Sequence, residues 1–233
     1  MFRMNHLSIW FFLLCITTTT VHAQRHELGI LIGGVNYIGE IGDTQYFNPK
    51  HLGYGIIYKR NITQRITLRA QFSTGKFSAN DQNATALDRR TRGLSFSNNY
   101  SALGVGVEAN YVALPIGEFG ISWTPYLHVG VQRLVVDELY FPEYENSATS
   151  HGRKMTMGVP FGAGIKVNLG QYWVIAAEVQ PQFTLTDNVD GSYPNTDKQP
   201  LAKQFSTSLS SDWLVFTGIS ITYAFGKLPC CRE

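Results

Sequence analysis

Residues 213–225 read WLVFTGISITYAF, and their side chains alternate between two kinds. One parity is mostly apolar and ends in Tyr223 and Phe225, whereas the other becomes small and polar toward its end. Because successive side chains of a β-strand point to opposite faces, the segment predicts a strand with one apolar face. Such a strand suits either a soluble β-sandwich or the lipid-facing wall of an outer-membrane barrel.

The N-terminus bears on this choice because it has the features of a secretory signal peptide. Arg3 and His6 give a weakly positive start, Leu7–Ile16 is almost entirely apolar, and Val21–Ala23 offers small residues for cleavage before Gln24. The apolar segment is too short for a good spanning helix. We therefore expect residues 1–23 to be a signal peptide and the mature protein to leave the cytoplasm.

Composition excludes several classes of function. After Ala23, no apolar run approaches the ~18 residues that a transmembrane helix needs. The net charge of the 233 residues is only +2, which gives no electrostatic support for nucleic-acid binding. Cys15 leaves with the signal peptide, and Leu14 stands where a lipoprotein signal needs a small residue. Cys230 and Cys231 are adjacent at the end of the chain, which is neither a disulfide framework nor a zinc site.

Alternating segments recur along the mature chain and are joined by connections of alternating length. The eight predicted strands lie near 27–37, 52–60, 66–75, 100–112, 124–136, 157–168, 172–183 and 213–225. The connections at 61–65, 113–123 and 168–171 are short or moderate, whereas those at 38–51, 76–99, 137–156 and 184–212 are long and polar. Compact soluble domains rarely carry several long loops, but outer-membrane barrels do.

This pattern predicts an all-β fold: an eight-stranded antiparallel transmembrane β-barrel over residues 24–225, with short periplasmic turns and long external loops. An even strand number places both ends of the barrel on the periplasmic side, where a signal peptide delivers the N-terminus. Residues 226–233 then form a periplasmic tail. The first strand is ambiguous, since Leu28, Ile30 and Ile32 compete with Leu31, Val35 and Tyr37 for the lipid-facing side.

The parity opposite the apolar one predicts the contents of the lumen. A polar network is expected from Lys59, Arg69, Glu108, Lys166 and Glu178, with Gln71, Asn110, His128, Gln132 and Gln180 around it. Charges inside a barrel should be paired, and eight strands enclose little more than their own side chains. We therefore expect a filled lumen, with His128 a satisfied interior histidine. The alternative is a narrow channel lined by the inward glycines Gly53, Gly55, Gly104, Gly106, Gly130, Gly162 and Gly164.

Catalytic and metal-binding patterns are weak in this sequence. His151, Asp187 and Asp190 fall in predicted external loops, where some barrel hydrolases keep catalytic groups, but a solvated loop is the favoured explanation for them. Asp187–Gly191 resembles a calcium loop only loosely, because further oxygen ligands are not in register. We expect no catalytic residue, no metal, no cofactor and no enzymatic activity.

Several segments, taken in order, resemble the PorG-like outer-membrane barrels of the Bacteroidetes type IX secretion system. They are 27–30 (ELGI), 36–40 (NYIGE), 68–71 (LRAQ), 92–96 (RGLSF), 124–127 (TPYL), 160–164 (PFGAG) and 186–193 (TDNVDGSY). The resemblance covers essentially the whole mature chain. It implies a non-enzymatic barrel in the outer-membrane lipid that links the periplasmic ring proteins PorK and PorN to the outer membrane.

If the lumen is filled, function must lie at the two ends of the barrel. The longest periplasmic turn carries apolar residues, and Leu114, Pro115, Ile116 and Phe119 are the candidate docking residues. The alternative is a turn that only rests on the barrel rim. Tyr223 and Phe225 are the candidate insertion signal, and the cysteines of the tail could form an intermolecular disulfide or stay as free thiols. The competing functions are a passive barrel with adhesin or receptor loops and, less favoured, a barrel enzyme.

Overall fold

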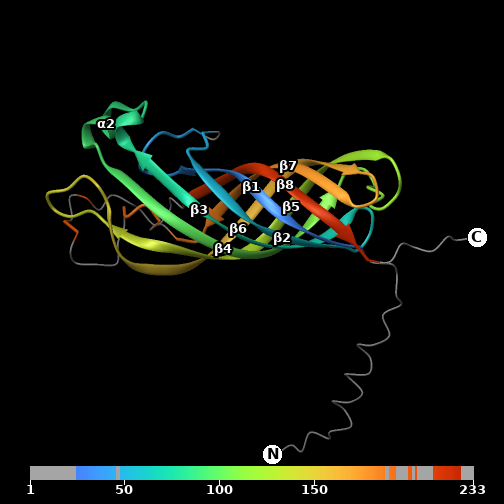
Figure 1. The fold of residues 1–233 in the computed structure, drawn as a ribbon. Helices are drawn as coiled ribbons and strands as arrows, with labels where there is room; N and C mark the ends of the chain where they lie inside the picture. Colours follow the sequence, from blue (N-terminus) through green and yellow to red (C-terminus); the bar gives the residue numbers. More distant parts are fainter. Residues whose placement is uncertain are drawn as a thin grey trace, which may run out of the picture.

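A computed structural model describes residues 25–45, 48–186, 189–192, 199–200, 203 and 212–226. In this part of the chain, each of eight antiparallel strands pairs with the next and the last pairs with the first, which closes the sheet into a barrel (Figure 1). The strands are β1 (Arg25–Ile38), β2 (His51–Asn61), β3 (Ile66–Asn80), β4 (Ser95–Asn110), β5 (Ile121–Tyr140), β6 (Thr149–Leu169), β7 (Trp173–Thr184) and β8 (Trp213–Phe225). The predicted eight-stranded antiparallel barrel is confirmed.

The strands are staggered around the wall. From Met155 on β6, the paired residues pass through every strand and return to β6 at Ile165, ten residues further along. The positions on the way are Val135, Ser101, Thr74, Tyr54, Ile32, Ile219 and Ala177. A stagger of this kind tilts the strands against the barrel axis.

The barrel has two unlike ends. Short connections join β2 to β3, β4 to β5 and β6 to β7 at one end, where β1 also begins and β8 ends; we refer to this as the turn end (Figure 1). The opposite end, which carries the longer connections, is the loop end. The expected signal peptide and the two cysteines lie outside the described residues, as does the tail beyond Gly226. Among the described residues, no helix is long and apolar enough to cross a membrane.

Four strands are longer than the sequence pattern predicts. β3 and β4 continue into the predicted loop 76–99, and β5 and β6 continue into the predicted loop 137–156. The pattern failed here because most outward positions of these extensions are polar, while inward positions such as Phe77, Phe96 and Leu139 remain buried. Between β3 and β4 lie the 3₁₀ helix η1 (Asp81–Asn83) and the helix α2 (Leu87–Arg92), neither of which was predicted.

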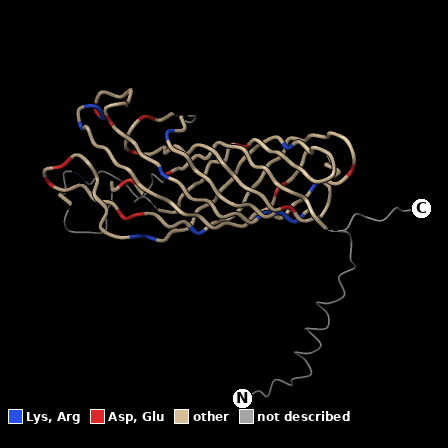
Figure 2. The backbone as a smooth tube through the Cα atoms, viewed as in Figure 1, with Lys and Arg blue, Asp and Glu red and all other residues tan. Residues whose placement is uncertain are grey.

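The outer surface of the barrel wall is apolar. On β1, Leu28, Ile30 and Ile32 are about half exposed, whereas Leu31 and Val35 are buried, which settles the ambiguous parity of this strand. Figure 2 shows the charged residues gathered toward the two ends, with the middle of the wall almost free of them. Exposed aliphatic and aromatic side chains continue around the other strands, as a lipid-facing surface requires.

The lumen is divided into an apolar part and a polar part. The apolar part is a core at the loop end, and it includes residues of the connections as well as of the strands. Its members are Leu31, Val35, Tyr37, Ile41, Phe77, Ala79, Leu94, Phe96, Tyr100, Ala102, Leu134, Val136, Leu139, Phe141, Val189, Leu214 and Phe216. The polar part lies nearer the turn end and holds the charged network described next.

Candidate functional site

The five predicted lumen residues meet in one buried cluster. Glu108 on β4 is at its centre: Lys59 Nζ on β2 lies 3.2 Å and Arg69 Nη1 on β3 lies 3.0 Å from its Oε1. Lys166 on β6 forms an ion pair with the other carboxylate oxygen. The contact of Lys59 is an ion pair without hydrogen-bond geometry. Three cations from three strands therefore share one carboxylate.

Glu178 on β7 forms the second half of the network. Both of its carboxylate oxygens accept from the guanidinium of Arg69, at 2.8 and 2.7 Å, and the hydroxyl of Tyr126 donates to it as well. Arg69 also donates from Nε to Gln71 at 2.8 Å. Buried charges are tolerated when they are paired and hydrogen-bonded in this way, and removing one member of such a set is costly.

Glu27 is a member of the polar lumen that the sequence did not reveal. It is 1% exposed and accepts hydrogen bonds from Asn61 Nδ2 at 2.7 Å and Thr222 Oγ1 at 2.6 Å. The available signal was its parity, which it shares with Leu31, but the ambiguity of the first strand concealed it. With Glu27, three buried acidic residues face the three buried basic residues.

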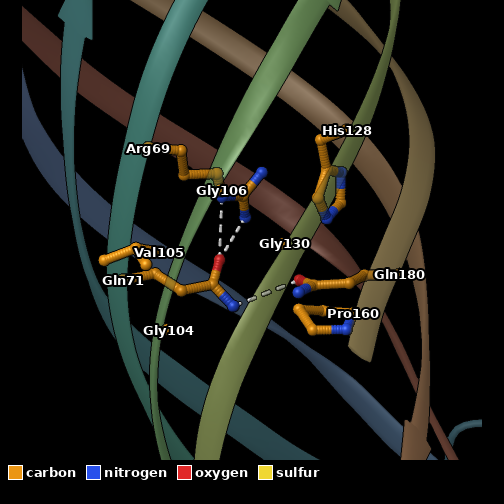
Figure 3. Close-up of a pocket in the computed structure, with 9 residues that line it drawn as sticks. All are labelled: Arg69, Gln71, Gly104, Val105, Gly106, His128, Gly130, Pro160 and Gln180. Carbon is orange, nitrogen blue, oxygen red and sulfur yellow. Dashed lines mark hydrogen bonds between the residues drawn. The ribbon is translucent and has the colours of Figure 1, made fainter. Parts of the chain in front are cut away.

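A small hollow, with room for about one water molecule, lies beside this network (Figure 3). Its polar lining includes Arg69, Gln71, His128 and Gln180, and Figure 3 shows them directed toward the same space. His128 is an interior residue as expected, but neither of its ring nitrogens has a hydrogen-bond partner among the described residues. The reason is local: Arg69 is already bound to carboxylates, and Gln180 accepts from Gln71 at 3.4 Å.

The inward glycines make room for rings. A Cβ on Gly164 would lie 2.8 Å from Cε1 of Tyr126, and one on Gly162 would lie 2.6 Å from Cε1 of His128. These separations are shorter than carbon atoms tolerate without displacement. The glycines therefore allow large side chains to cross the lumen, and this packing argues against a channel lined by glycine.

A group of carboxyls lies at the loop end. Asp190 is fully buried, so its assignment to a solvated loop is wrong; the connection after β7 folds inward and carries it under the rim. Carboxylate oxygens of Glu40, Asp190 and Asp212 lie within 4.8 Å of one another. Asp187 lies outside the described residues.

The suggested catalytic set does not assemble in the described part of the chain. His151 lies in β6, not in a loop, and its Nε2 is 3.7 Å from Oε2 of Glu138. The side-chain contacts of Asp190 are with Tyr37 and Ser192 instead.

At the turn end, the predicted docking residues differ in exposure. Leu114 is buried, contrary to expectation, because its backbone N–H donates to the carbonyl of Gln64 at 3.0 Å and folds it against the barrel rim. Pro115 and Ile116 are half-buried. Phe119 is 88% exposed.

The two residues of the candidate insertion signal lie on the outer wall of β8. The ring of Phe225 stacks on His26 at 5.7 Å, and that of Tyr223 contacts Tyr172 and Trp173 at 5.6 and 5.3 Å. These rings form an aromatic group near the turn end, as expected where a barrel meets the membrane–water interface.

Closed topology, an apolar outer wall and a charged interior define the class: an eight-stranded outer-membrane-type β-barrel. The chain belongs to the family described as a domain of unknown function, DUF6089, whose model matches residues 5–233.

Comparisons with other proteins add the following. No curated protein sequence matches the chain. Similar solved structures include the N-terminal β-barrel domain of Pseudomonas aeruginosa OprF, with 13% identity, 88% of this chain and 98% of that chain covered and a TM-score of 0.44. They also include the attachment invasion locus protein Ail of Yersinia pestis in complex with the heparin analogue sucrose octasulfate, with 11% identity, 88% and 100% coverage and a TM-score of 0.47. Neisserial surface protein A has 8% identity, 87% and 96% coverage and a TM-score of 0.43.

Proposed function

We propose that this barrel is a non-enzymatic outer-membrane component of the type IX protein secretion apparatus, which links the periplasmic ring proteins PorK and PorN to the membrane. The resemblance of the sequence to PorG-like barrels supports the assignment. The filled lumen, in which Glu108, Lys59 and Lys166 are all buried, is the observation that supports a function at the ends of the barrel. A barrel without a free interior acts through its ends.

In this proposal the turn end faces the periplasm and Phe119 is the principal docking residue. Its ring is 88% exposed on the connection between β4 and β5, and Tyr111 and Ile121 at the two ends of this connection are 79% and 77% exposed. Exposed aromatic residues of this kind are typical anchors of protein interfaces. Leu114 has a different role, since its buried side chain holds the connection against the rim.

Co-purification tests this function. Tagged full-length protein, extracted in detergent from its native host, should bring down PorK and PorN. Phe119→Ser should lose them, whereas Tyr144→Ser, which changes a 92% exposed ring in the connection between β5 and β6, should retain them. The proposal fails if the wild-type barrel captures neither ring protein and its deletion leaves the secretion of C-terminally signalled cargo intact.

One observation favours the alternative of a barrel that presents a receptor or adhesin surface. The strands β3 to β6 continue past the apolar wall, and their outward positions there are polar, as at Ser97, Asn99 and Ser101. This gives the loop end a rigid, water-exposed surface that carries α2 (Figure 1). Loss of host-surface binding in a variant with a shortened connection 81–94, with co-purification of the ring proteins unchanged, would support this second role.

A further inference from the structure

A short piece of the connection between β7 and β8, Val189–Ser192, closes the interior of the barrel at the loop end. Val189 is fully buried in the apolar core. Its carbonyl accepts from Nδ2 of Asn98 at 2.7 Å, and its N–H donates to Oδ2 of Asp212 at 3.2 Å. This piece is thus attached to β4 on one side and to the start of β8 on the other.

The third attachment is a bridge through Tyr37 on β1. Its hydroxyl lies 2.9 Å from Oδ2 of Asp190 and also contacts Oδ1 of Asp212. A tyrosine hydroxyl has one proton to donate, and an ionised carboxylate can only accept. Both contacts can be hydrogen bonds only when one of the two carboxyls carries a proton of its own. The bridge therefore requires at least one proton shared between Asp190 and Asp212.

The chain beside the bridge leaves no room for a side chain at position 39. A Cβ on Gly39 would lie 1.9 Å from the hydroxyl oxygen of Tyr37 and 2.5 Å from Oδ1 of Asp212. Both aspartates are fully buried, and none of the ion pairs among the described residues includes either of them. Two ionised carboxylates in this position would repel each other in a poorly solvated space.

Among the residues that the structure describes, no charged group near the bridge forms an ion pair with either aspartate. Glu40, which follows β1, is a third carboxyl near the pair. On α2, Arg92 pairs with Asp81 of η1 at 2.7 Å, and Arg89 donates to the carbonyl of Gly39 at 3.2 Å. Asp137 on β5 is 3.5 Å from Arg153. Burial raises the pKa of Asp190 to about 6, and burial together with the charge of Asp190 raises the pKa of Asp212 well above its ordinary value.

We propose that Val189–Ser192 is a proton-operated latch. It is closed while Asp190 and Asp212 share a proton through Tyr37, and it is released from the loop end when both carboxyls ionise. Release would expose the apolar core around Val189 and the inner face of the extended strands. The latch is independent of the proposed function, since it concerns the opposite end of the barrel.

Hydrogen exchange in the folded barrel tests the latch. The full mature chain in detergent micelles with EDTA is followed by NMR from about pH 5 to about pH 9, and protection factors are taken so that the intrinsic pH dependence of exchange cancels. The amides of Val189 and Ser192 should lose roughly tenfold or more of their protection as the pH rises through neutrality. Asp212→Asn, which keeps a neutral donor and acceptor, should hold the protection at high pH.

Two further variants separate the bridge from general effects. Tyr37→Phe removes the hydroxyl and should leave both amides weakly protected at every pH, while the strand amides stay protected. Asp43→Asn is the matched control, because Asp43 accepts from Gln45 Nε2 in an exposed part of the loop end. In this variant the protection factors of Val189 and Ser192 should change with pH as they do in the wild type.

Three results would overturn the latch. One is a protection of Val189 and Ser192 that does not change with pH in the wild type. Another is an equal loss of protection in Asp212→Asn. The third is full recovery of protection at high pH on addition of millimolar calcium without EDTA, which would mean that the carboxyls hold a cation and not a proton. Should Asp212→Asn fail to fold, the carboxyl ¹³C shifts of the wild type decide, and ionisation of both aspartates near an ordinary pKa of about 4 refutes the proposal.

Discussion

Arg69 and Glu178 form a bidentate ion pair inside the barrel, with Nη1 and Nη2 of the guanidinium 2.8 and 2.7 Å from the two carboxylate oxygens. The pair spans the lumen between β3 and β7, which do not pair with each other in the sheet. Side chains of strands that are distant in the wall are thereby connected across the interior. The polar part of the lumen therefore holds a network of paired charges, and each member is stabilised by the others.

Replacing Arg69 should destabilise the barrel because it leaves Glu178 with only the hydroxyl of Tyr126, whereas Glu108 keeps Lys59 and Lys166. An uncompensated buried carboxylate costs about 3–5 kcal/mol. We expect a loss of that size for Arg69→Met, measured by urea unfolding in micelles. The double variant Arg69→Met, Glu178→Met removes both charges and should recover most of it. Additive losses in the double variant would contradict the coupling.

Overpacking of the apolar part is a separate prediction. A Cβ on Gly53 would lie 2.6 Å from Cγ2 of Val35, with Tyr100 and Phe216 next at 3.2 and 3.4 Å. All three contacts are with side chains, so Gly53→Ala should cost about 1–3 kcal/mol and be partly relieved by Val35→Ala.

The control for this experiment is Gly152→Ala, since the nearest atom to its new Cβ is Oε2 of Glu138 at 3.8 Å. It should change the unfolding free energy by less than about 0.5 kcal/mol. If Gly53→Ala is as harmless as the control, the glycine does not accommodate the core.

A filled lumen predicts that the protein conducts no ions. Reconstituted in planar bilayers, the wild type should give no stable conductance steps, because aromatic rings cross the loop-end half and the ion pairs of Glu108 occupy the other. Reproducible steps from the wild type, absent from Gly53→Ala, would instead support a narrow channel along the glycines.

The sequence was sufficient for features that depend on local alternation. Parity placed Arg69 and Glu178 on the inner face because a strand has a period of two. Features that depend on contacts between residues far apart in the sequence could not be predicted from this alternation. Asp190 is buried by Tyr37, 153 positions away in the chain, and Leu114 by Gln64 on another connection.

Polar outward residues also caused the strand ends to be predicted as loops where the barrel wall extends beyond its apolar part. The outward positions of the extended strands face water, so Ser97 and Asn99 gave those segments the composition of a loop. Only every second residue, such as Phe96, retained the apolar signal.

The carboxyl pair at the loop end should also give the stability of the protein an unusual pH dependence. A carboxyl whose pKa is raised on folding binds more protons in the folded state than in the unfolded state, so its contribution to stability is lost as the pH rises. With the pKa of Asp190 raised to about 6 by burial, the wild type should lose stability relative to Asp190→Asn as the pH rises from about 4 through about 6. Urea midpoints across this range measure the difference, with Asp43→Asn as the control. A constant difference between wild type and Asp190→Asn would show that the carboxyl ionises alike in both states.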